Sequence, residues 1–297
     1  CGLFPSGTDA GGPGCSSRTG AGRTAGATSS GSVADVSGRP HPFLRGAHPV
    51  AIAHRGGAAE GAENSPATFQ RVVDLGYRWI ETDVRASIDG HAVVFHDATL
   101  NRTTDAQGEV SALPLSRIRA AHLADSEHPI TLTEALRSWP DVRFNVDVKA
   151  DDTVQAFLRA VSEAQAWDRV CVAAFSTARL RRLRHLAGPR LASSMGPSEV
   201  TRLVLGIPDR SPACAAQVPH SMGGLPVVTR ALVRRAHSRG LAVQVWTIDD
   251  PHEMASLLDM GVDGIMTDRP TLLREVLVSR HSWTGPLPGF AAGETGE

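Results

Sequence analysis

From Val50 onward, short apolar segments alternate with amphipathic helical ones, and this alternation restricts the chain to a small set of folds. Strands that alternate with helices are typical of βα units, which build a parallel sheet. Eight strands would close into a TIM (β/α)8 barrel if a ninth, at 92–95, is an accessory hairpin strand after the turn at Asp89 and Gly90. The expected strands lie at about residues 50–54, 78–83, 92–95, 143–149, 169–175, 190–194, 214–218, 241–246 and 262–267.

Helical segments are expected between most of these strands. The first has Ser65 as N-cap and Pro66 at the first helical position, and it ends at Gly76. An open, doubly wound sheet is the alternative architecture, but the segment HRGGAAEG after the first strand lacks the spacing and helix start of a dinucleotide-binding loop. The barrel is therefore favoured. Six further helices are expected at residues 132–139, 153–165, 177–188, 229–240, 251–261 and 270–280.

The composition excludes several classes of protein. With 41% hydrophobic and 21% charged residues, the chain of 297 residues has ample material for a soluble core. No apolar run approaches the ~20 residues of a membrane-spanning helix, so no transmembrane segment is expected. A net charge of -1 argues against a nucleic-acid partner, which would require a basic face. The expected partner is a small molecule.

The two ends of the chain differ from the rest in composition. Residues 1–49 contain 11 of the 29 glycines and few large apolar residues. We therefore expect a flexible, disordered N-terminal tail rich in Gly, Ser, Thr and Pro. Residues 50–280 are expected to form a single barrel domain with a short insertion after its second strand, and residues 281–297 a flexible C-terminal tail.

The chain begins with Cys1 rather than with methionine. We favour a cytoplasmic protein whose true start lies further in, near Val33 or Val36. The alternative is a bacterial lipoprotein in which Cys1 carries the lipid, which would make the protein lipid-anchored or secreted. Membrane association is expected only if Cys1 is lipidated. Cys171 and Cys214 lie in apolar segments and are expected to be free, buried thiols.

Polar and aromatic residues stand at the ends of several expected strands. In a parallel barrel the carboxyl ends of all strands open onto one face, so these residues converge even when they are far apart in the sequence. The topology therefore predicts one site at that face. The residues are His54, Glu81, Asp83, His96, Asp147, Lys149, Trp246 and Asp268.

Three of these residues suggest a metal site. Glu81 and Asp83 are two residues apart on one strand, so their side chains point the same way with Cα atoms ~7 Å apart. They could instead be surface carboxylates, solvated or paired with arginine. Two like charges inside a barrel would repel each other unless a cation compensates, which favours a metal. Asp147 would supply a third oxygen ligand, and a ligand set without cysteine indicates Mg²⁺ or Ca²⁺.

His54 and His96 each end an apolar segment beside these carboxylates. A single histidine at a strand end is more often only a hydrogen-bonding residue. Two of them beside three carboxylates form a reasonable general acid and base pair, since imidazole titrates near pH ~6.5.

Two basic residues are expected at the same face. Arg55 follows His54, and Lys149, the only lysine in the chain, is two residues from Asp147. They could be counterions of the carboxylates or a clamp on a phosphate group, and both roles can coexist. Phe175 and Trp246 are either packing residues at the barrel mouth or an apolar wall against an alcohol moiety.

With these residues in this order, the chain resembles the glycerophosphodiester phosphodiesterase family from about Val50 to Leu277. The resemblance implies a TIM barrel that hydrolyses glycerophosphodiesters to an alcohol and sn-glycerol 3-phosphate with a divalent cation. The motifs that carry it are His54-Arg55-Gly56, Glu63-Asn64, Glu81-x-Asp83, His96-Asp97, Arg102-Thr103-Thr104, Asn145-x-Asp147-x-Lys149, Trp246-Thr247 and Thr267-Asp268-x-Pro270.

The resemblance also implies roles for individual residues. The segment from about Asp97 to Pro129 corresponds to an insertion that covers the site and is short here. Asp147 stands where glutamate is commoner, which shortens the reach of the third ligand by ~1.5 Å and leaves the identity of the metal open. The implied roles are metal ligand for Glu81, Asp83 and Asp147, acid or base for His54 and His96, phosphate contact for Arg55 and Lys149, and ligand support or glycerol contact for Glu63.

Two other functions remain open. The first is a lysophospholipase D or phospholipase-type phosphodiesterase that acts on bulkier lipids, ranked second because the short insertion offers no obvious apolar lid. The second is a non-catalytic barrel that binds phosphate esters, although every catalytic position carries a competent side chain. A serine hydrolase is not expected, since the sequence has no GxSxG motif.

Overall fold

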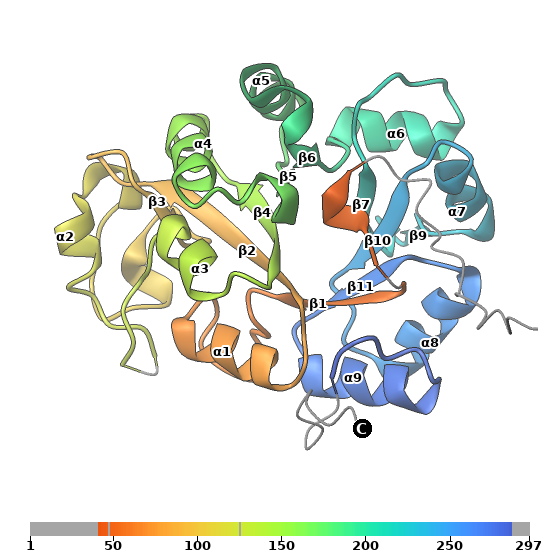
Figure 1. Ribbon diagram of the computed structural model, residues 1–297, viewed down its shortest axis with the longest axis horizontal. Helices are drawn as coiled ribbons and strands as arrows, with labels where there is room; N and C mark the ends of the chain where they lie inside the picture. Colours follow the sequence, from red (N-terminus) through yellow and green to blue (C-terminus); the bar gives the residue numbers. More distant parts are fainter. Residues whose placement is uncertain (1–40, 47, 125, 287–297) are drawn as a thin grey trace, which may run out of the picture. The chain divides into compact units, whose positions relative to one another are not determined.

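A computed structural model describes residues 41–46, 48–124 and 126–286, which all belong to one structural unit, residues 35–297. In the described residues, eight parallel strands form a nearly closed barrel (Figure 1). A parallel bridge between Ser194 and Ala215 links its two end strands, so the chain folds as the predicted TIM barrel. In order around the barrel the strands are β6 (Ala192–Ser193), β5 (Val170–Ala173), β4 (Arg143–Val148), β2 (Trp79–Ala86), β1 (Val50–His54), β11 (Gly264–Thr267), β10 (Ala242–Trp246) and β7 (Ala215–Pro219).

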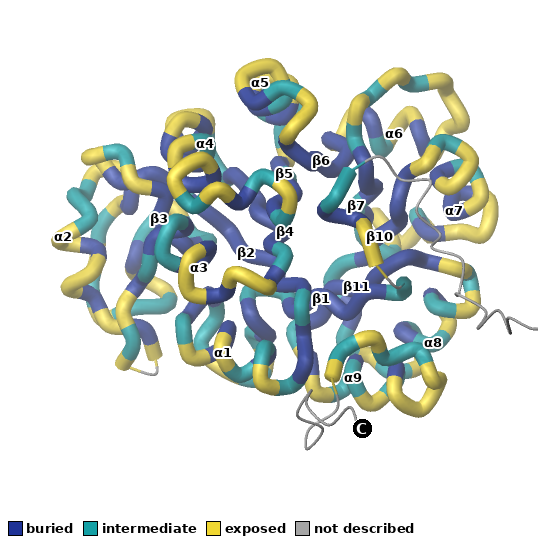
Figure 2. The backbone as a smooth tube through the Cα atoms, viewed as in Figure 1, coloured by how far each residue is buried: buried dark blue, intermediate teal, exposed yellow. Residues whose placement is uncertain are grey.

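Helices follow the barrel strands and cover the outside of the barrel (Figure 1). Figure 2 shows the strands buried and the outer faces of the helices exposed, as an amphipathic pattern requires. The helices that follow the strands are α1 (Pro66–Asp74), α3 (Leu132–Ser138), α4 (Thr153–Glu163), α5 (Thr177–Ala187), α6 (Pro197–Leu205), α7 (Arg230–His237), α8 (Pro251–Met260) and α9 (Pro270–Ser279).

All of the predicted strands and helices are present, with small shifts of their ends. Strand β3 (Ala92–Val94) pairs antiparallel with β2, as expected for the accessory strand. Apart from 3-10 helices, three elements were not predicted, namely the short helix α2 (Leu115–Ile118), helix α6 and a hairpin of β8 (Ser221–Met222) and β9 (Leu225–Pro226). The hairpin strands are only two residues long, which is too short to show an alternating pattern.

The loop after β1 packs closely on α1. As predicted, Ser65 caps this helix, and its hydroxyl oxygen accepts a hydrogen bond from the backbone N–H of Thr68 at 3.2 Å. Gly56 has a φ of +80°, and a Cβ atom at this position would lie 2.7 Å from the ring of Phe69. Glycine at this position therefore lets the segment that carries His54 and Arg55 turn tightly against the helix.

The described parts of the two expected tails pack against the barrel, in contrast to the sequence-based expectation. Phe43 and Leu44 lie in a 3-10 helix (Pro42–Leu44) and are fully buried, and the Phe43 ring contacts Trp79 edge-on at 4.6 Å. At the other end, Trp283 contacts the Tyr77 ring at 5.3 Å. Two apolar side chains are thus enough to anchor a segment of otherwise polar composition. Residues 1–40 and 287–297, the remainder of the two expected tails, lie outside the described residues.

Replacing Phe43 with alanine is expected to lower the free energy of unfolding by about 3 kcal/mol, because the substitution leaves a cavity beneath the barrel. Unfolding in urea measures this change. Ile88→Ala is the control, because Ile88 is 65% exposed and its loss should change stability by less than about 0.5 kcal/mol. A loss below about 1 kcal/mol for Phe43→Ala would show that this segment does not contribute to the core.

The insertion after β2 has a small core of its own. It contains the short helix α2 (Leu115–Ile118) and two 3-10 helices, Leu100–Arg102 and Val110–Ala112. Phe95, Leu100, Val110, Ile118 and Leu123 pack together there. Elsewhere, Cys171 and Cys214 are free and buried, as expected. Among the described helices, none has the length and apolar character that crossing a membrane would require.

Candidate active site

The carboxyl ends of the barrel strands line a cavity of about 780 Å³. Glu63 and Asp268 were also expected at this face but lie outside this lining. The Glu63 carboxylate accepts hydrogen bonds from Arg55 Nη1 at 3.2 Å and Arg102 Nη2 at 2.7 Å. The barrel thus brings together residues from five strands and their loops. The predicted residues that line the cavity are His54, Arg55, Glu81, Asp83, His96, Asp147, Lys149, Phe175 and Trp246.

Asp83 and Asp147 lie side by side, because the register of β2 and β4 pairs them. The ammonium nitrogen of Lys149 lies 2.7 Å from Asp83 Oδ1 and 2.7 Å from Asp147 Oδ2. Arg55 Nε lies 3.2 Å from Asp83 Oδ2. In this structure both basic residues therefore act as counterions of the buried carboxylates, which is one of the two roles expected for them.

Burial and charge shift the pKa values of these carboxylates. Burial, together with the negative charge of Asp83, raises the pKa of Glu81 to about 7. Burial also raises the pKa of Asp147, against the opposing charge of Lys149. For Asp83, burial acts in the same direction, but Lys149 and Arg55 outweigh it and lower the pKa. The raised pKa of Glu81 indicates that the positive charges of Arg55 and Lys149 do not fully compensate the negative charges of the three carboxylates.

The expected metal ligands are not assembled as a closed set. In the described part of the chain, no three His, Cys, Asp or Glu side chains are arranged to hold a metal ion. The physical reason is that the Lys149 ammonium bridges Asp83 and Asp147. The donor atoms nevertheless suit a hard cation, since Asp147 Oδ1 is buried and lacks a hydrogen-bond partner, and carboxylate oxygens are preferred ligands of Mg²⁺ and Ca²⁺.

His54 is held by an aspartate at the end of the last barrel strand. Its Nδ1 lies 2.7 Å from Asp268 Oδ1, and its Nε2 lies 3.6 Å from Glu81 Oε2. The backbone N–H of Asp268 donates to Asp249 Oδ1 at 2.8 Å, which fixes the loop that carries the aspartate. Burial lowers the pKa of His54, but the charges of Glu81 and Asp268 outweigh it and raise the value.

His96 has a similar arrangement on the other side of β2. Its Nδ1 lies 2.6 Å from Asp97 Oδ1, and Asp97 Oδ2 accepts a hydrogen bond from Arg102 Nε at 2.6 Å. The hydrogen bond from Arg102, with that from His96, holds the pKa of Asp97 well below its usual range. Since both active-site histidines engage an aspartate through Nδ1, each has Nε2 left for other partners. Glu63 connects the two sides, because it binds both Arg55 and Arg102.

Two residues at this site, Asp97 and Asn64, were not assigned as site residues from the sequence, and Asp268 was expected at this face but was given no role. Asp97 and Asp268 belong to the recognised motifs, but their contacts with the histidines depend on loop geometry. Asn64 is buried with a φ of +59°, and its side-chain amide donates to Asp83 Oδ2 at 3.1 Å while its carbonyl accepts from Thr82 Oγ1 at 2.7 Å. The position of Asp97, Asp268 and Asn64 next to a predicted motif residue or strand end is the signal that could have indicated their roles.

Apolar side chains line the rest of the cavity. The Phe175 ring packs edge-on against Trp246 at 5.7 Å, beside Lys149. The insertion from Asp97 to Pro129 was expected to cover the site, but none of its described residues lines the cavity. An apolar wall comes instead from α6, the β8–β9 hairpin and residues next to them. Its residues are Pro197, Val200, Val204 and Leu205 in α6, Met222, Leu225 and Pro226 in the hairpin, and Met195, Pro219 and Val227 beside them.

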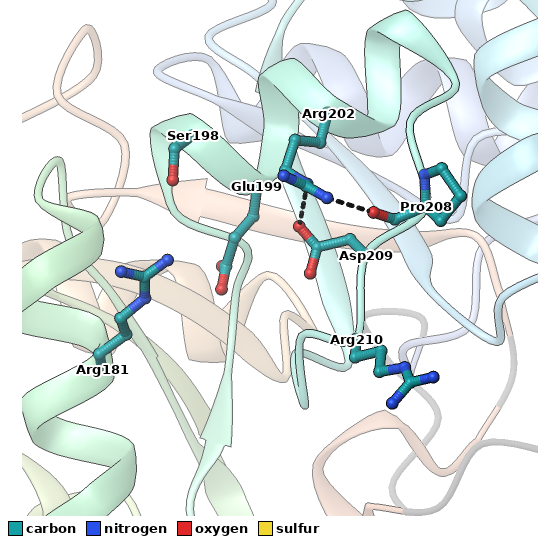
Figure 3. Close-up of a pocket in the computed structure, with 7 residues that line it drawn as sticks. All are labelled: Arg181, Ser198, Glu199, Arg202, Pro208, Asp209 and Arg210. Atoms are coloured by element: carbon teal, nitrogen blue, oxygen red, sulfur yellow. Dashed lines mark hydrogen bonds and ion pairs between the residues drawn. The ribbon is translucent and has the colours of Figure 1, made fainter.

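A second, smaller cavity lies beside α6 (Figure 3). Arg202 crosses it and binds Asp209 Oδ2 at 3.3 Å and the backbone carbonyl of Pro208 at 2.6 Å. These bonds hold the segment that follows α6. None of the predicted catalytic or ligand residues lines this cavity.

The sequence has well-matched relatives. The profile described as "Glycerophosphoryl diester phosphodiesterase family" matches residues 54–272. A Mycobacterium tuberculosis protein named "Probable glycerophosphodiester phosphodiesterase 2" is 40% identical over 253 residues, which cover 82% of this chain and 96% of that protein. A Rattus norvegicus protein named "Lysophospholipase D GDPD1" is 26% identical over 270 residues, which cover 76% of this chain and 85% of that protein.

A solved structure shares the fold. It is an Oleispira antarctica phosphodiesterase in complex with the product sn-glycerol-3-phosphate. It aligns with a TM-score of 0.67 at 23% identity, and the alignment covers 78% of this chain and 97% of that chain. The profile match spans the barrel from the end of β1 into α9, which includes every strand-end residue described above. This chain belongs to the glycerophosphoryl diester phosphodiesterase family.

Proposed function

We propose that this chain hydrolyses glycerophosphodiesters to an alcohol and sn-glycerol 3-phosphate. The observation that carries the proposal is that two histidines, each bound through Nδ1 to an aspartate, line one cavity with Arg55, Lys149 and buried carboxylates. The relatives support it, since the Mycobacterium tuberculosis protein is named for this activity and the Oleispira antarctica structure holds the product.

The side chains of the cavity divide the reaction between them. Arg55 and Lys149 bind the phosphoryl oxygens, whose negative charge increases in the transition state. The Nε2 atom of one imidazole accepts a proton from the attacking nucleophile. The Nε2 atom of the other imidazole donates a proton to the oxygen of the departing alcohol. Asp97 and Asp268 orient the two rings, because a carboxylate at Nδ1 favours the tautomer that carries its proton there.

Glu81, Asp83 and Asp147 are the residues that would hold a divalent cation, Mg²⁺ or Ca²⁺. When bound, such a cation supplies positive charge at the phosphoryl group. With a cation bound, Asp83 and Asp147 would no longer depend on Arg55 and Lys149 as counterions, which would leave these two side chains for the substrate. Asn64 keeps Asp83 in place through its hydrogen bond to Oδ2.

A second candidate substrate is a phosphodiester with an apolar alcohol portion, such as a lysophospholipid. From the sequence, this substrate class ranks second because the short insertion offers no obvious apolar lid. The cavity has an apolar wall from another source, which includes Met195, Val200, Val204 and Val227. Apolar walls with a few convergent polar groups suit ligands with an alkyl portion. The Rattus norvegicus relative, named a lysophospholipase D, agrees with this candidate.

The experiment that tests the function is a substrate panel. Glycerophosphocholine and lysophosphatidylcholine are each incubated with the full chain in Mg²⁺, in Ca²⁺ or in chelator. Release of glycerol 3-phosphate from glycerophosphocholine supports the first candidate, and choline release from lysophosphatidylcholine supports the second. Binding of glycerophosphocholine without turnover in either cation would overturn the proposal in favour of a non-catalytic phosphate-ester-binding barrel.

Asp268→Asn is expected to lower kcat for glycerophosphocholine at least about tenfold, because an amide at this position no longer favours the proton on Nδ1 of His54. KM should change little, since Asp268 does not line the cavity. Steady-state kinetics measure both constants. Asp105→Asn is the matched control, because Asp105 binds His122 Nδ1 at 3.0 Å in the insertion. Equal kcat values for the two variants would remove Asp268 from the proposed mechanism.

A further inference from the structure

Four strongly exposed apolar side chains belong to the lining of the active-site cavity. Phe175 is 69% exposed and packs on Trp246. The other three, Leu205, Met222 and Leu225, are 66%, 65% and 73% exposed. We call these three residues the mouth rim. Large apolar side chains that gather at one opening are unusual on a surface that faces only water. The mouth rim therefore needs an explanation beyond the packing of the fold.

The mouth rim is built from two separate segments. Leu205 ends α6 just before Gly206, which has a φ of +74° and terminates the helix. Met222 and Leu225 flank the turn of the β8–β9 hairpin, whose strands pair with each other and not with the barrel sheet. The turn residues Gly223 and Gly224 have open space around them. The hairpin therefore presents its two apolar side chains outward at the edge of the cavity.

The two segments that carry the mouth rim contain more basic than acidic residues. Residues 201–210 and 221–230 contain three arginines, Arg202, Arg210 and Arg230, and a single acidic residue, Asp209. Asp209 is already paired with Arg202 at 3.3 Å. The whole chain, in contrast, has a net charge of -1. Exposed apolar side chains in segments that also carry arginines match a surface that is apolar inside and carries anionic headgroups.

We propose that the mouth rim docks on the surface of an anionic phospholipid membrane, with the active-site cavity opening onto it. This inference rests on the proposed function, in particular on phosphodiesters with an apolar alcohol portion, because such substrates reside in a lipid surface. Leu205, Met222 and Leu225 enter the headgroup region, while Arg210 and Arg230 lie among the phosphates. A substrate molecule then passes from the lipid surface along the apolar wall to the histidines without crossing bulk water.

Sedimentation with lipid vesicles tests this proposal. The full chain is mixed with phosphatidylcholine vesicles that contain phosphatidylglycerol, and with vesicles of phosphatidylcholine alone. We expect binding to the anionic vesicles that weakens with added salt. The affinity of the double variant Met222→Ser, Leu225→Ser for the anionic vesicles should be lower by at least about tenfold, because two large apolar side chains no longer enter the lipid. Ile88→Ser is the matched control, since Ile88 is also 65% exposed but does not line the cavity.

Activity measurements separate this proposal from the proposed function. The double variant should lose far more of its turnover of lysophosphatidylcholine presented in anionic vesicles than of soluble glycerophosphocholine, because only the substrate in vesicles requires docking. If the wild-type chain cleaves glycerophosphocholine but does not bind anionic vesicles, docking is overturned and the proposed function stands. If vesicle binding follows the mouth rim but no phosphodiester is cleaved, the proposed function fails instead. Equal vesicle binding by the double variant and Ile88→Ser, or a change in self-association of the double variant, would also overturn docking.

Discussion

Replacing His54 or His96 with alanine is expected to lower kcat for glycerophosphocholine by about 10²-fold or more, because each substitution removes a proton-transfer group from the reaction. Both imidazoles line the cavity, and both are held through Nδ1, by Asp268 at 2.7 Å and by Asp97 at 2.6 Å. The loss should appear mainly in kcat, since Arg55 and Lys149 still bind the phosphate group. Release of glycerol 3-phosphate measures the rate.

His122→Ala is the matched control for both variants. His122 also pairs with an aspartate, Asp105, but it lies in the insertion and does not line the cavity. Its activity should equal that of the wild-type chain. Thermal unfolding of the His54 and His96 variants verifies that the fold is intact. A turnover near the wild-type value in either folded variant would remove that histidine from the chemistry.

Exhaustive removal of divalent cations with a chelator is expected to abolish turnover, and Mg²⁺ or Ca²⁺ should restore it. Of the three buried carboxylates in this cavity, Asp83 and Asp147 pair with Arg55 and Lys149, and the pKa of the third, Glu81, is raised to about 7. A divalent cation would compensate this excess of negative charge and add positive charge at the phosphoryl group. Glycerol 3-phosphate release is measured before chelation, after it, and after each cation is returned.

A binding measurement distinguishes a site on the carboxylates from a cation bound elsewhere. Added Mg²⁺ or Ca²⁺ should raise the Tm of the chelated wild-type chain, because a ligand that binds only the folded state stabilises it. In Glu81→Gln this rise should be smaller, since one of the three carboxylates is lost. Full activity after all cations are removed would eliminate the cation from the mechanism, and an unchanged rise in Glu81→Gln would place the cation at another site.

Much of the fold could be predicted because each barrel strand has a local signal. The segment from Val50 to His54 and that from Ala242 to Trp246 are short apolar runs bounded by polar residues, and they form β1 and β10. Elements without such a signal were missed, as the two-residue strands β8 and β9 show. The end of the tail was also misplaced, because composition averages over a segment whereas Phe43 is buried as a single side chain.

The sequence indicated most of the residues that lie at the candidate site, but not the contacts between them. Strand ends placed Asp83, Asp147 and Lys149 at one face, which requires only the topology of the barrel. That Lys149 bridges the two aspartates depends on the register of β2 and β4 and on a side-chain conformation. The insertion was expected to cover the site, whereas α6 and the hairpin, which were not predicted, supply part of the cavity wall.

The sequence by itself determined the order of strands and helices, the family, and which polar side chains meet at the barrel mouth. Periodicity and strand ends are local properties, and the closure of a parallel barrel converts them into proximity. Only the tertiary structure decided that Asp268 holds His54, that Lys149 lies between two carboxylates, and that Leu205 and Leu225 stand at the same opening. Such contacts depend on loop paths and rotamers, which are set by packing between segments far apart in the chain.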